Sequence, residues 1–380
     1  MDKSNLLLSS FSGLEDPRAE THSRRHLLSD ILTLTILAVI CNADTWVAIE
    51  RFGRSKEGWL KTFLELPNGI PSHDTLGDLF SRLDPKQLQA CFLDWVAALF
   101  KISDGEIIAI DGKTLRGSYD TASSRGAIHM VNAWACKNGV TLGQYKTAEK
   151  SNEITAIPEL LKVLNLKGNI ITIDAMGCQK AIAAQIVEQE GDYVFNLKAN
   201  QTSLHQDVEL FFTSYLDKGR LQETSMATHE VIEGDHGRVE TRRYWLTQDI
   251  GWLSQAGSWT GLKSIGLVEY ESIDKSSGEI TTERRYFISS LSADAKQFAQ
   301  AVRLHWGVES MHWCLDVGFN EDACRVRKDY GPENLAVIRQ IALNLLKQET
   351  TAKVGIKTKR LMAGWDHAYL AKLLQGGTNV

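Results

Sequence analysis

The sequence is poor in cysteine, in proline and in long apolar runs. It has six cysteines and six prolines among 380 residues. The cysteines are scattered without a CxxC pair, which argues against a disulfide framework or a structural zinc site and is typical of reduced thiols in the cytoplasm. The best membrane candidate, Leu27 to Cys41, is about 15 residues long and contains Asp30, whereas a membrane span needs ~20 apolar residues. We therefore expect a buried core helix there.

An excess of positive charge is also absent. The formal net charge is -5, which argues against a protein that coats nucleic acid indiscriminately, although an acidic protein can still carry a local basic surface. The apolar content of 43% and charged content of 23% are those of an ordinary globular protein. A chain of this length has room for two or more domains.

The pattern of apolar residues changes along the chain. Residues up to about 100 have helical periodicity, with Ser72 as a predicted N-cap and four apolar residues on one face of the helix that follows (Leu76, Leu79, Phe80 and Leu83). From Ile107 the predicted order is strand, hairpin, helix, strand, helix, strand, which indicates a mixed α/β sheet. Residues 201–290 read as a β-rich insertion, and helices return after it. We expect a helical domain over 1–100 and an α/β domain over 101–380.

Two predicted strands end on an aspartate. IIAIDG places Asp111 after an apolar run, and IITIDA places Asp174 in the same way. A single aspartate at a strand end commonly caps the next turn. Two such strands side by side would instead bring both carboxylates to one edge of the sheet, where their repulsion favours a bound cation. Hard oxygen ligands of this kind suit Mg²⁺ or Mn²⁺.

A third acid is predicted on a helix near residue 309. Helical spacing places Glu309 on one stripe, which we expect to face inward, where an ionised carboxylate is costly unless it is paired or binds a metal. The apolar members of this stripe are Phe298, Val302, Trp306 and Trp313. The alternative partners of Glu309 are His305 and Arg303, and Asp316 is the rival third acid.

Cys178 lies just after the second acid-ending strand, at a predicted helix start. A thiol there could be activated, which would suggest a metal-independent cysteine hydrolase. Because the sequence offers no base for it, a structural role for Cys178 is favoured.

Five segments carry a resemblance to a known family: IAIDGKTLRGS, ITIDAMGCQ, NLKANQ, HGRVETRR and HWGVESMHWCLDVGFNEDACRVRKDYGPENLAVIRQIALNLLK. With them the chain resembles the DDE transposases of bacterial insertion sequences, in the H-repeat-associated branch, from about Leu14 to the last helices. Related transposases carry a Tyr, an Arg and a Lys around the helical glutamate. Those three places hold Val302, His305 and Asp316 here.

This resemblance implies a ribonuclease H-like catalytic core, interrupted by the β-rich insertion and preceded by a helical N-terminal domain. It implies that Asp111, Asp174 and Glu309 are the catalytic triad and hold two divalent metal ions, Mg²⁺ with Mn²⁺ able to substitute. The implied partners are the terminal inverted repeats of the element and target DNA, with a homodimer in the DNA complex, in the cytoplasm or at the nucleoid. The alternative is a decayed or domesticated relative that binds DNA without cutting it.

The predicted DNA contacts come from three segments. HGRVETRR supplies His236, Arg238 and Arg242, NLKANQ supplies Lys198, Asn200 and Gln201, and the glutamate helix supplies Arg303 and His305. For any one of them a solvated strand face or an ion pair with Glu240 is an equally good interpretation. Trp306 could stack on a base, but filling the core is the favoured interpretation.

Overall fold

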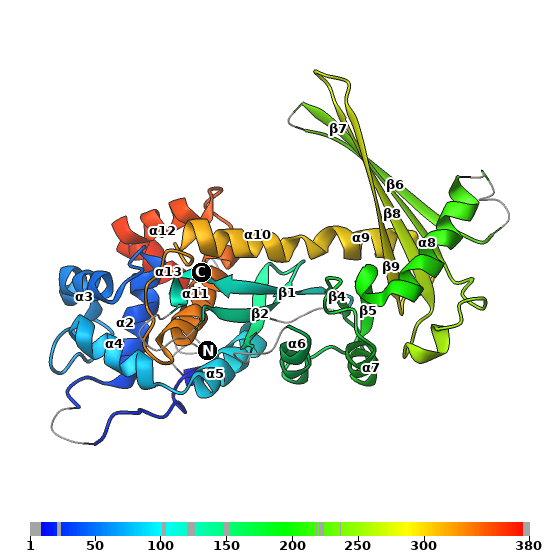
Figure 1. The fold of residues 1–380 in the computed structure, drawn as a ribbon. Helices are drawn as coiled ribbons and strands as arrows, with labels where there is room; N and C mark the ends of the chain where they lie inside the picture. The colour runs from blue at the N-terminus through cyan, green and yellow to red at the C-terminus, as the bar shows by residue number, and fades with distance from the viewer. Residues whose placement is uncertain are drawn as a thin grey trace. The chain divides into compact units, whose positions relative to one another are not determined.

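The computed structural model describes residues 9–20, 24–100, 104–119, 126–147, 153–217, 219, 224–235 and 237–374. The chain divides into two compact units (Figure 1). Unit 1 comprises Met1–Ile102, Gly112–Lys150 and Glu309–Val380, and unit 2 comprises Ser103–Asp111 and Ser151–Val308. Strand β1 (Ile107–Leu115) therefore begins in unit 2 and ends in unit 1.

The helices at the N-terminal end of unit 1 follow the predicted periodicity. They are α2 (Leu28–Ile40), α3 (Trp46–Leu60), α4 (His73–Arg82) and α5 (Pro85–Leu99). Helix α2 is buried from Asp30 onward, which confirms the predicted core helix. The Ser72 side chain accepts a hydrogen bond from the Thr75 backbone N–H at the start of α4, as predicted for an N-cap.

The rest of unit 1 consists of a hairpin and the C-terminal helices. The hairpin pairs β2 (Ile128–Ala135) with β3 (Val140–Lys146) and turns at Gly139, whose φ of +65° suits glycine. The later elements are α10 (Gly307–Trp313), the π-helical turn η5 (Cys314–Gly318), α11 (Gly331–Gln348), α12 (Ile356–Trp365) and α13 (His367–Leu374). Helix α11 is buried over most of its length and contacts α2, α4, α5 and β3, so it forms the centre of this unit.

A mixed sheet runs through the chain in the strand order β3-β2-β1-β4-β5-β9-β8-β7-β6. In unit 2, β4 (Ile170–Ile173) lies parallel to both β1 and β5 (Asp192–Leu197), and β9 (Ile280–Ser289) runs antiparallel to β5. The connecting helices are α6 (Glu153–Lys162) and α7 (Lys180–Glu188). This order confirms the predicted mixed α/β class.

The predicted β-rich insertion contains four long antiparallel strands, but it begins with a helix that the prediction missed. The helix is α8 (Thr202–Leu216), and the strands are β6 (Ala227–Asp235), β7 (Arg238–Thr247), β8 (Ser264–Asp274) and β9. Helix α8 forms because Leu204, Val208, Phe211 and Phe212 repeat at helical spacing and are buried.

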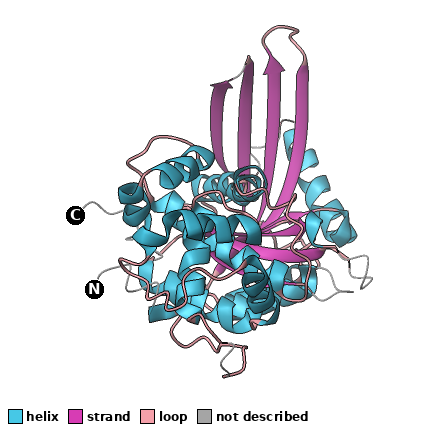
Figure 2. Cartoon of the chain, turned by 90° about the vertical axis from the view of Figure 1, so that its left-hand side faces the viewer, coloured by secondary structure: helices cyan, strands magenta, loops and turns pink. Residues whose placement is uncertain are grey.

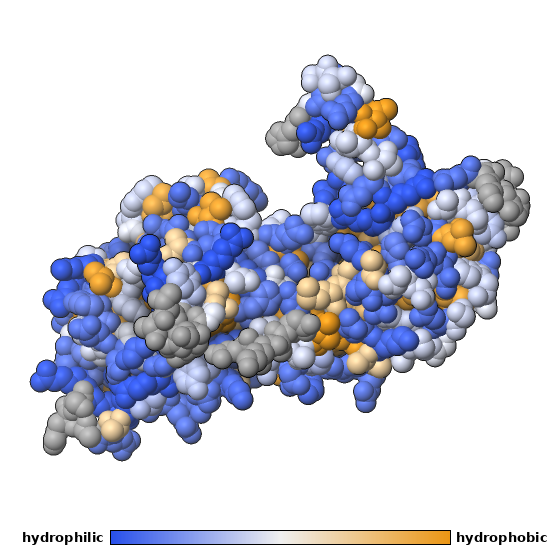
Figure 3. Space-filling view, in the orientation of Figure 1, coloured by the Kyte–Doolittle hydropathy of each residue, from blue (hydrophilic) through white to orange (hydrophobic). Residues whose placement is uncertain are grey.

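Among the residues that the structure describes, no helix packs on the outer ends of β6 to β9 (Figure 2). The surface of these strands in Figure 3 is mostly hydrophilic. At their inner ends, α9 (Ala295–His305) packs on β6 and β7 and also reaches β4 and β5. Among the described residues, no helix is both long and apolar enough to cross a membrane.

Candidate active site

Asp111 and Asp174 occupy adjacent positions on neighbouring parallel strands. The pairing of β1 with β4 ends at Ile110 opposite Ile173, and the next residue along the chain is Asp111 within β1 and Asp174 directly after β4. Neighbouring strands lie ~4.8 Å apart, so the two aspartates lie side by side just beyond the last paired residues. The expectation that the first strand ends at Asp111 is wrong, because β1 continues to Leu115 after its pairing with β4 has stopped.

Asp174 begins a tight turn that its own side chain stabilises. Its Oδ1 accepts hydrogen bonds from the backbone N–H groups of Met176 at 3.0 Å and Gly177 at 3.3 Å. Gly177 is required here, because a Cβ at this position would lie 2.2 Å from Ile173 Cγ2. Burial raises the pKa of Asp174, and the charge of Glu153 raises it further, against the lowering effect of the two N–H donors.

Two predicted DNA contacts instead hold this turn. The Nδ2 of Asn200 donates to the carbonyl of Ala175 at 2.6 Å, and the Nε2 of Gln201 donates to the carbonyl of Cys178 at 2.9 Å. The segment after β5 is thereby fastened to the segment that follows Asp174. Lys198, the third member of the same motif, is exposed.

The donor set of Asp111 and Asp174 fits a divalent cation. Both are carboxylates at adjacent positions, and hard oxygen ligands suit Mg²⁺ and Mn²⁺. Within the described residues, Asp174 has no ion pair with a lysine, arginine or histidine. The same residues contain no group of three or more His, Cys, Asp or Glu side chains arranged to hold a metal. The two aspartates alone are therefore brought together by the sheet.

His305 is fixed on the strand that carries Asp174. Its Nδ1 lies 2.9 Å from the Thr172 hydroxyl, two residues before Asp174. Desolvation lowers the pKa of His305 to about 4, so the imidazole is neutral at physiological pH. This contact holds the C-terminal end of α9 on β4 in unit 2.

Glu309 is exposed, so the predicted inward-facing stripe is wrong beyond Val302. Trp306 and Trp313 are 40% and 64% exposed. The stripe was built mostly from steps of four residues, and each such step overshoots a helical turn of 3.6 residues, so the stripe drifts around the helix. The buried face of α10 and η5 is made by Val308, Met311 and Leu315.

The rival acid Asp316 belongs to a buried ion cluster in unit 1. The Nζ of Lys113 lies 2.6 Å from Asp316, 2.8 Å from Glu321 and 3.5 Å from Asp322. Arg339, which is 2% exposed, lies 3.5 Å from the other oxygen of Glu321. Although burial acts to lower the pKa of Lys113, the surrounding carboxylates raise it above its ordinary value. The sequence signal for this cluster is a lysine at an inward position of β1, and it was missed.

The predicted basic face of β7 is neutralised by glutamates. Arg242 pairs with Glu233 at 2.6 Å and Glu240 at 2.5 Å, and its guanidinium lies over the Tyr270 ring. The ion pair with Glu240 is one of the two alternatives to a DNA contact, and for Arg242 it is present.

The other basic residues predicted to contact DNA are more exposed. Arg238 lies 3.9 Å from Asp274, and Arg303, at 54% side-chain exposure, lies 3.9 Å from Glu233. His236 lies outside the described residues. The core interpretation of Trp306 is wrong, because its ring is partly exposed and Arg285 lies over it at 5.1 Å.

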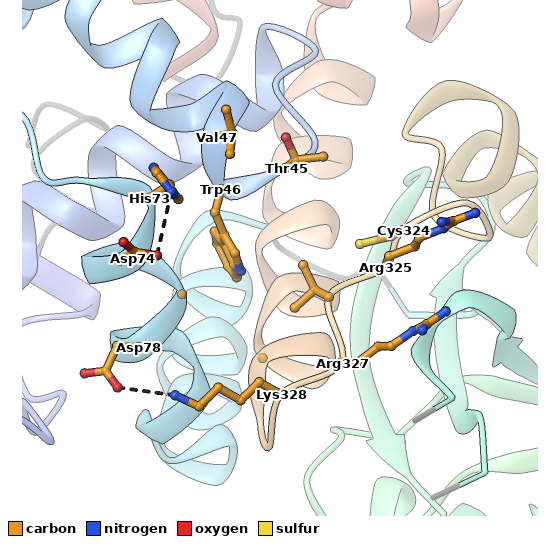
Figure 4. Close-up of a pocket in the computed structure, with 13 residues that line it drawn as sticks. Thr45, Trp46, Val47, His73, Asp74, Asp78, Cys324, Arg325, Arg327 and Lys328 are labelled. Atoms are coloured by element: carbon orange, nitrogen blue, oxygen red, sulfur yellow. Dashed lines mark hydrogen bonds and ion pairs between the residues drawn. The ribbon is translucent and has the colours of Figure 1, made fainter. Parts of the chain in front are cut away.

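A pocket of about 690 Å³ in unit 1 has a basic wall that sequence reasoning missed (Figure 4). That wall includes Arg325, Arg327 and Lys328, and the opposite wall comes from the start of α3 and from α4. Lys328 lies 3.5 Å from Asp78 across the pocket. The signal was three basic residues among four in the segment RVRK.

Cys178 is buried, and burial raises the pKa of its thiol to about 12. The nucleophilic thiolate is therefore essentially absent at neutral pH. This environment agrees with the favoured structural role for Cys178.

Comparison with known proteins bears on the whole chain. Residues 102–345 match the family model of the transposase DDE domain, and residues 8–96 match the model described as DDE_Tnp_1-associated. The chain is 44% identical over 360 residues to "Putative transposase YncI" of Escherichia coli O157:H7, covering 92% of this chain and 90% of that protein. It is 42% identical over 367 residues to "H repeat-associated putative transposase YhhI" of Escherichia coli strain K12, covering 94% of both chains.

Proposed function

The chain belongs to the DDE transposase family, in its H-repeat-associated group, and we propose that it is the DNA transposase of an insertion-sequence element. In this proposal it hydrolyses phosphodiester bonds at the element ends and joins the freed ends to target DNA. The observation that carries the proposal is the adjacent placement of Asp111 and Asp174 on the parallel strands β1 and β4. A ribonuclease H-like core is part of the proposal.

The proposed site is completed by Glu309. Two divalent ions, Mg²⁺ or in its place Mn²⁺, would be held by Asp111, Asp174 and Glu309, and when bound they would activate the attacking water and stabilise the leaving 3′-oxygen. Asp111 is the proposed shared ligand, because β1 lies between β2 and β4 in the strand order. The turn after Asp174 occupies Oδ1 with two backbone N–H groups and thereby fixes the orientation of the carboxylate.

The same carboxylates serve both chemical steps in this proposal. Hydrolysis frees a 3′-hydroxyl at the element end, and that hydroxyl then attacks a phosphodiester of the target DNA. Both steps are in-line displacements at phosphorus, so neither requires a covalent enzyme intermediate. His305, at the end of α9, remains neutral and supports β4 through its contact with Thr172.

The proposed DNA contacts favour the exposed basic residues. Lys198, Arg238 and Arg303 are exposed and suit phosphate oxygens. Arg242 would have to exchange its glutamate partners for phosphate, and Asn200, Gln201 and His305 would act mainly by holding the site. We also propose that DNA is bound by a homodimer, as in the family expectation.

The test uses a plasmid that carries the gene with its native flanking DNA, incubated with purified protein and Mg²⁺. Asp174→Asn should lower strand cleavage by more than ~10²-fold, because the amide replaces an ionised oxygen ligand. Binding to the same DNA in EDTA should stay within about twofold. Retained cleavage would refute the role of Asp174, whereas binding without cleavage by the wild-type protein would favour the decayed relative.

A further inference from the structure

Lys113 is a buried cation on the strand that carries Asp111. The two residues are two positions apart on the strand, so their side chains share a face of β1. Lys113 is 8% exposed, and its Nζ lies 2.6 Å from Asp316 Oδ1 and 2.8 Å from Glu321 Oε2. A buried ammonium group is costly unless it is paired. Its partners come from a segment about 200 residues further along the chain. Their carboxylates offset the cost of burying the charged ammonium group.

The partner segment is the continuation of the helix that carries Glu309. Asp316 lies in η5, seven residues after Glu309, which is about two helical turns. A second contact holds the same helix in unit 1, because the Nδ2 of Asn132 on β2 lies 3.2 Å from the Nε2 of His312, three residues after Glu309. Side chains from two adjacent strands therefore fix this helix.

The backbones that follow Lys113 and Asp316 also meet. A Cβ at Gly117 would lie 2.0 Å from the carbonyl oxygen of Cys324, so only glycine allows this approach. The Nε of Arg327 donates to the Gly117 carbonyl at 3.1 Å. The ion pairs of Lys113 thus lie at one end of a longer contact between the two segments.

We infer that Lys113 is a positioning residue for the metal-binding acids. Through its ion pairs with Asp316 and Glu321, it fastens the helix that carries Glu309 to the part of β1 that follows Asp111. It also keeps Asp316 occupied, which leaves Glu309 as the third ligand. This inference rests on the proposed function, and Lys113 touches no reacting group in it.

The test measures Mn²⁺ affinity of the full-length protein by electron paramagnetic resonance, without DNA, in the wild type, Lys113→Met and Glu349→Gln. Glu349 is the matched control, because its buried side chain pairs with Lys372 at 3.2 Å in the same unit but does not contact the Lys113 cluster. Lys113→Met should weaken Mn²⁺ binding by ~10-fold or more. Glu349→Gln should lower the melting temperature and leave Mn²⁺ affinity unchanged.

If Lys113→Met does not fold, Asp316→Asn replaces it, because the Asp316 side chain is 32% exposed and its loss is milder. A variant that melts earlier but binds Mn²⁺ as the wild type does would overturn the inference and leave Lys113 a purely structural residue. In that case Asp174→Asn would still lose Mn²⁺, and the proposed function would stand. Equal Mn²⁺ binding by the wild type and Asp174→Asn would instead contradict the proposed function itself.

Discussion

Asp174 and Asp316 are both partly buried aspartates, but they are stabilised differently. Burial raises the pKa of each. Asp316 has the ammonium group of Lys113 at 2.6 Å, whereas the hydrogen bonds of Asp174 within the described residues come from two backbone N–H groups. Within the part of the chain that the structure describes, Asp316 therefore has a cation in direct contact, whereas Asp174 has no ion pair and, among cations, feels the charge of Lys198 from further away. This difference separates a structural acid from an acid that can bind an external cation.

The same contrast separates individual basic residues. In unit 2, Arg242 and Arg243 are each paired with glutamates from neighbouring strands, so the sheet neutralises them. In unit 1, Arg325 is exposed on the wall of a pocket. A basic residue in the sequence predicts a DNA contact only when the fold has not already given it a partner.

The largest effect on stability is expected when an acid of the Lys113 cluster is compared with Asp174. Glu321→Gln should lower the free energy of unfolding by roughly 3 kcal/mol, because it leaves Lys113 and Arg339 with too few buried carboxylates. Asp174→Asn should change it by less than ~0.5 kcal/mol, since the amide oxygen can still accept both backbone N–H groups. Urea unfolding measures both values. A larger loss of unfolding free energy in Asp174→Asn than in Glu321→Gln would contradict this distinction, because it would make Asp174 the structural acid.

His305 gives a pH-dependent test of the strand that carries Asp174. Its pKa of about 4 lies below the ordinary value near 6.5, so between these values the unfolded chain binds more protons than the folded one. The contribution of neutral His305 to the free energy of unfolding is fully present above pH 6.5 and is lost as the pH falls toward 4. The loss should reach ~3 kcal/mol.

The control for this effect is His305→Asn, which keeps a side-chain amide near Thr172 but has no titrating ring. The free energy of unfolding of this variant should fall less steeply than that of the wild type between pH 6.5 and 4.5. A residual slope should remain from His312, because desolvation lowers the pKa of this histidine to about 4 as well. Identical slopes in urea unfolding would show that His305 is already protonated or exposed in the folded protein.

Asn200→Ala separates a positioning role from a DNA contact. Loss of its hydrogen bond to the Ala175 carbonyl should loosen the turn after Asp174 and lower cleavage by ~10-fold. DNA affinity in EDTA should remain within about twofold. Lys198→Ala is the comparison, because this exposed lysine should weaken DNA binding and reduce its salt dependence. Weaker binding by Asn200→Ala would instead return this residue to the DNA interface.

The smallest effect is expected at Cys178. Because burial raises the pKa of the thiol to about 12, Cys178→Ala should cleave DNA within twofold of the wild-type rate. Loss of cleavage in a variant that melts normally would support the cysteine-based alternative.

The sequence predicted the elements whose periodicity is local. Helix α4 with its Ser72 cap, the β2–β3 hairpin and the two strands that carry Asp111 and Asp174 are all present. Spacing along one helix failed at Glu309, because small errors of phase accumulate over several turns. The inward position of Lys113 on β1 was a signal for a buried cation, but its partners could not be identified from the sequence, because they lie about 200 residues further along and only the fold brings them to Lys113.

The most direct test of the account is Mn²⁺ binding to the wild type and to Asp174→Asn, measured by electron paramagnetic resonance without DNA. We expect that the wild type binds Mn²⁺ and that Asp174→Asn, with an unchanged circular dichroism spectrum, loses this binding. Equal binding by the two proteins, or no binding by either, would contradict the claim that Asp174 is an acid left for an external cation.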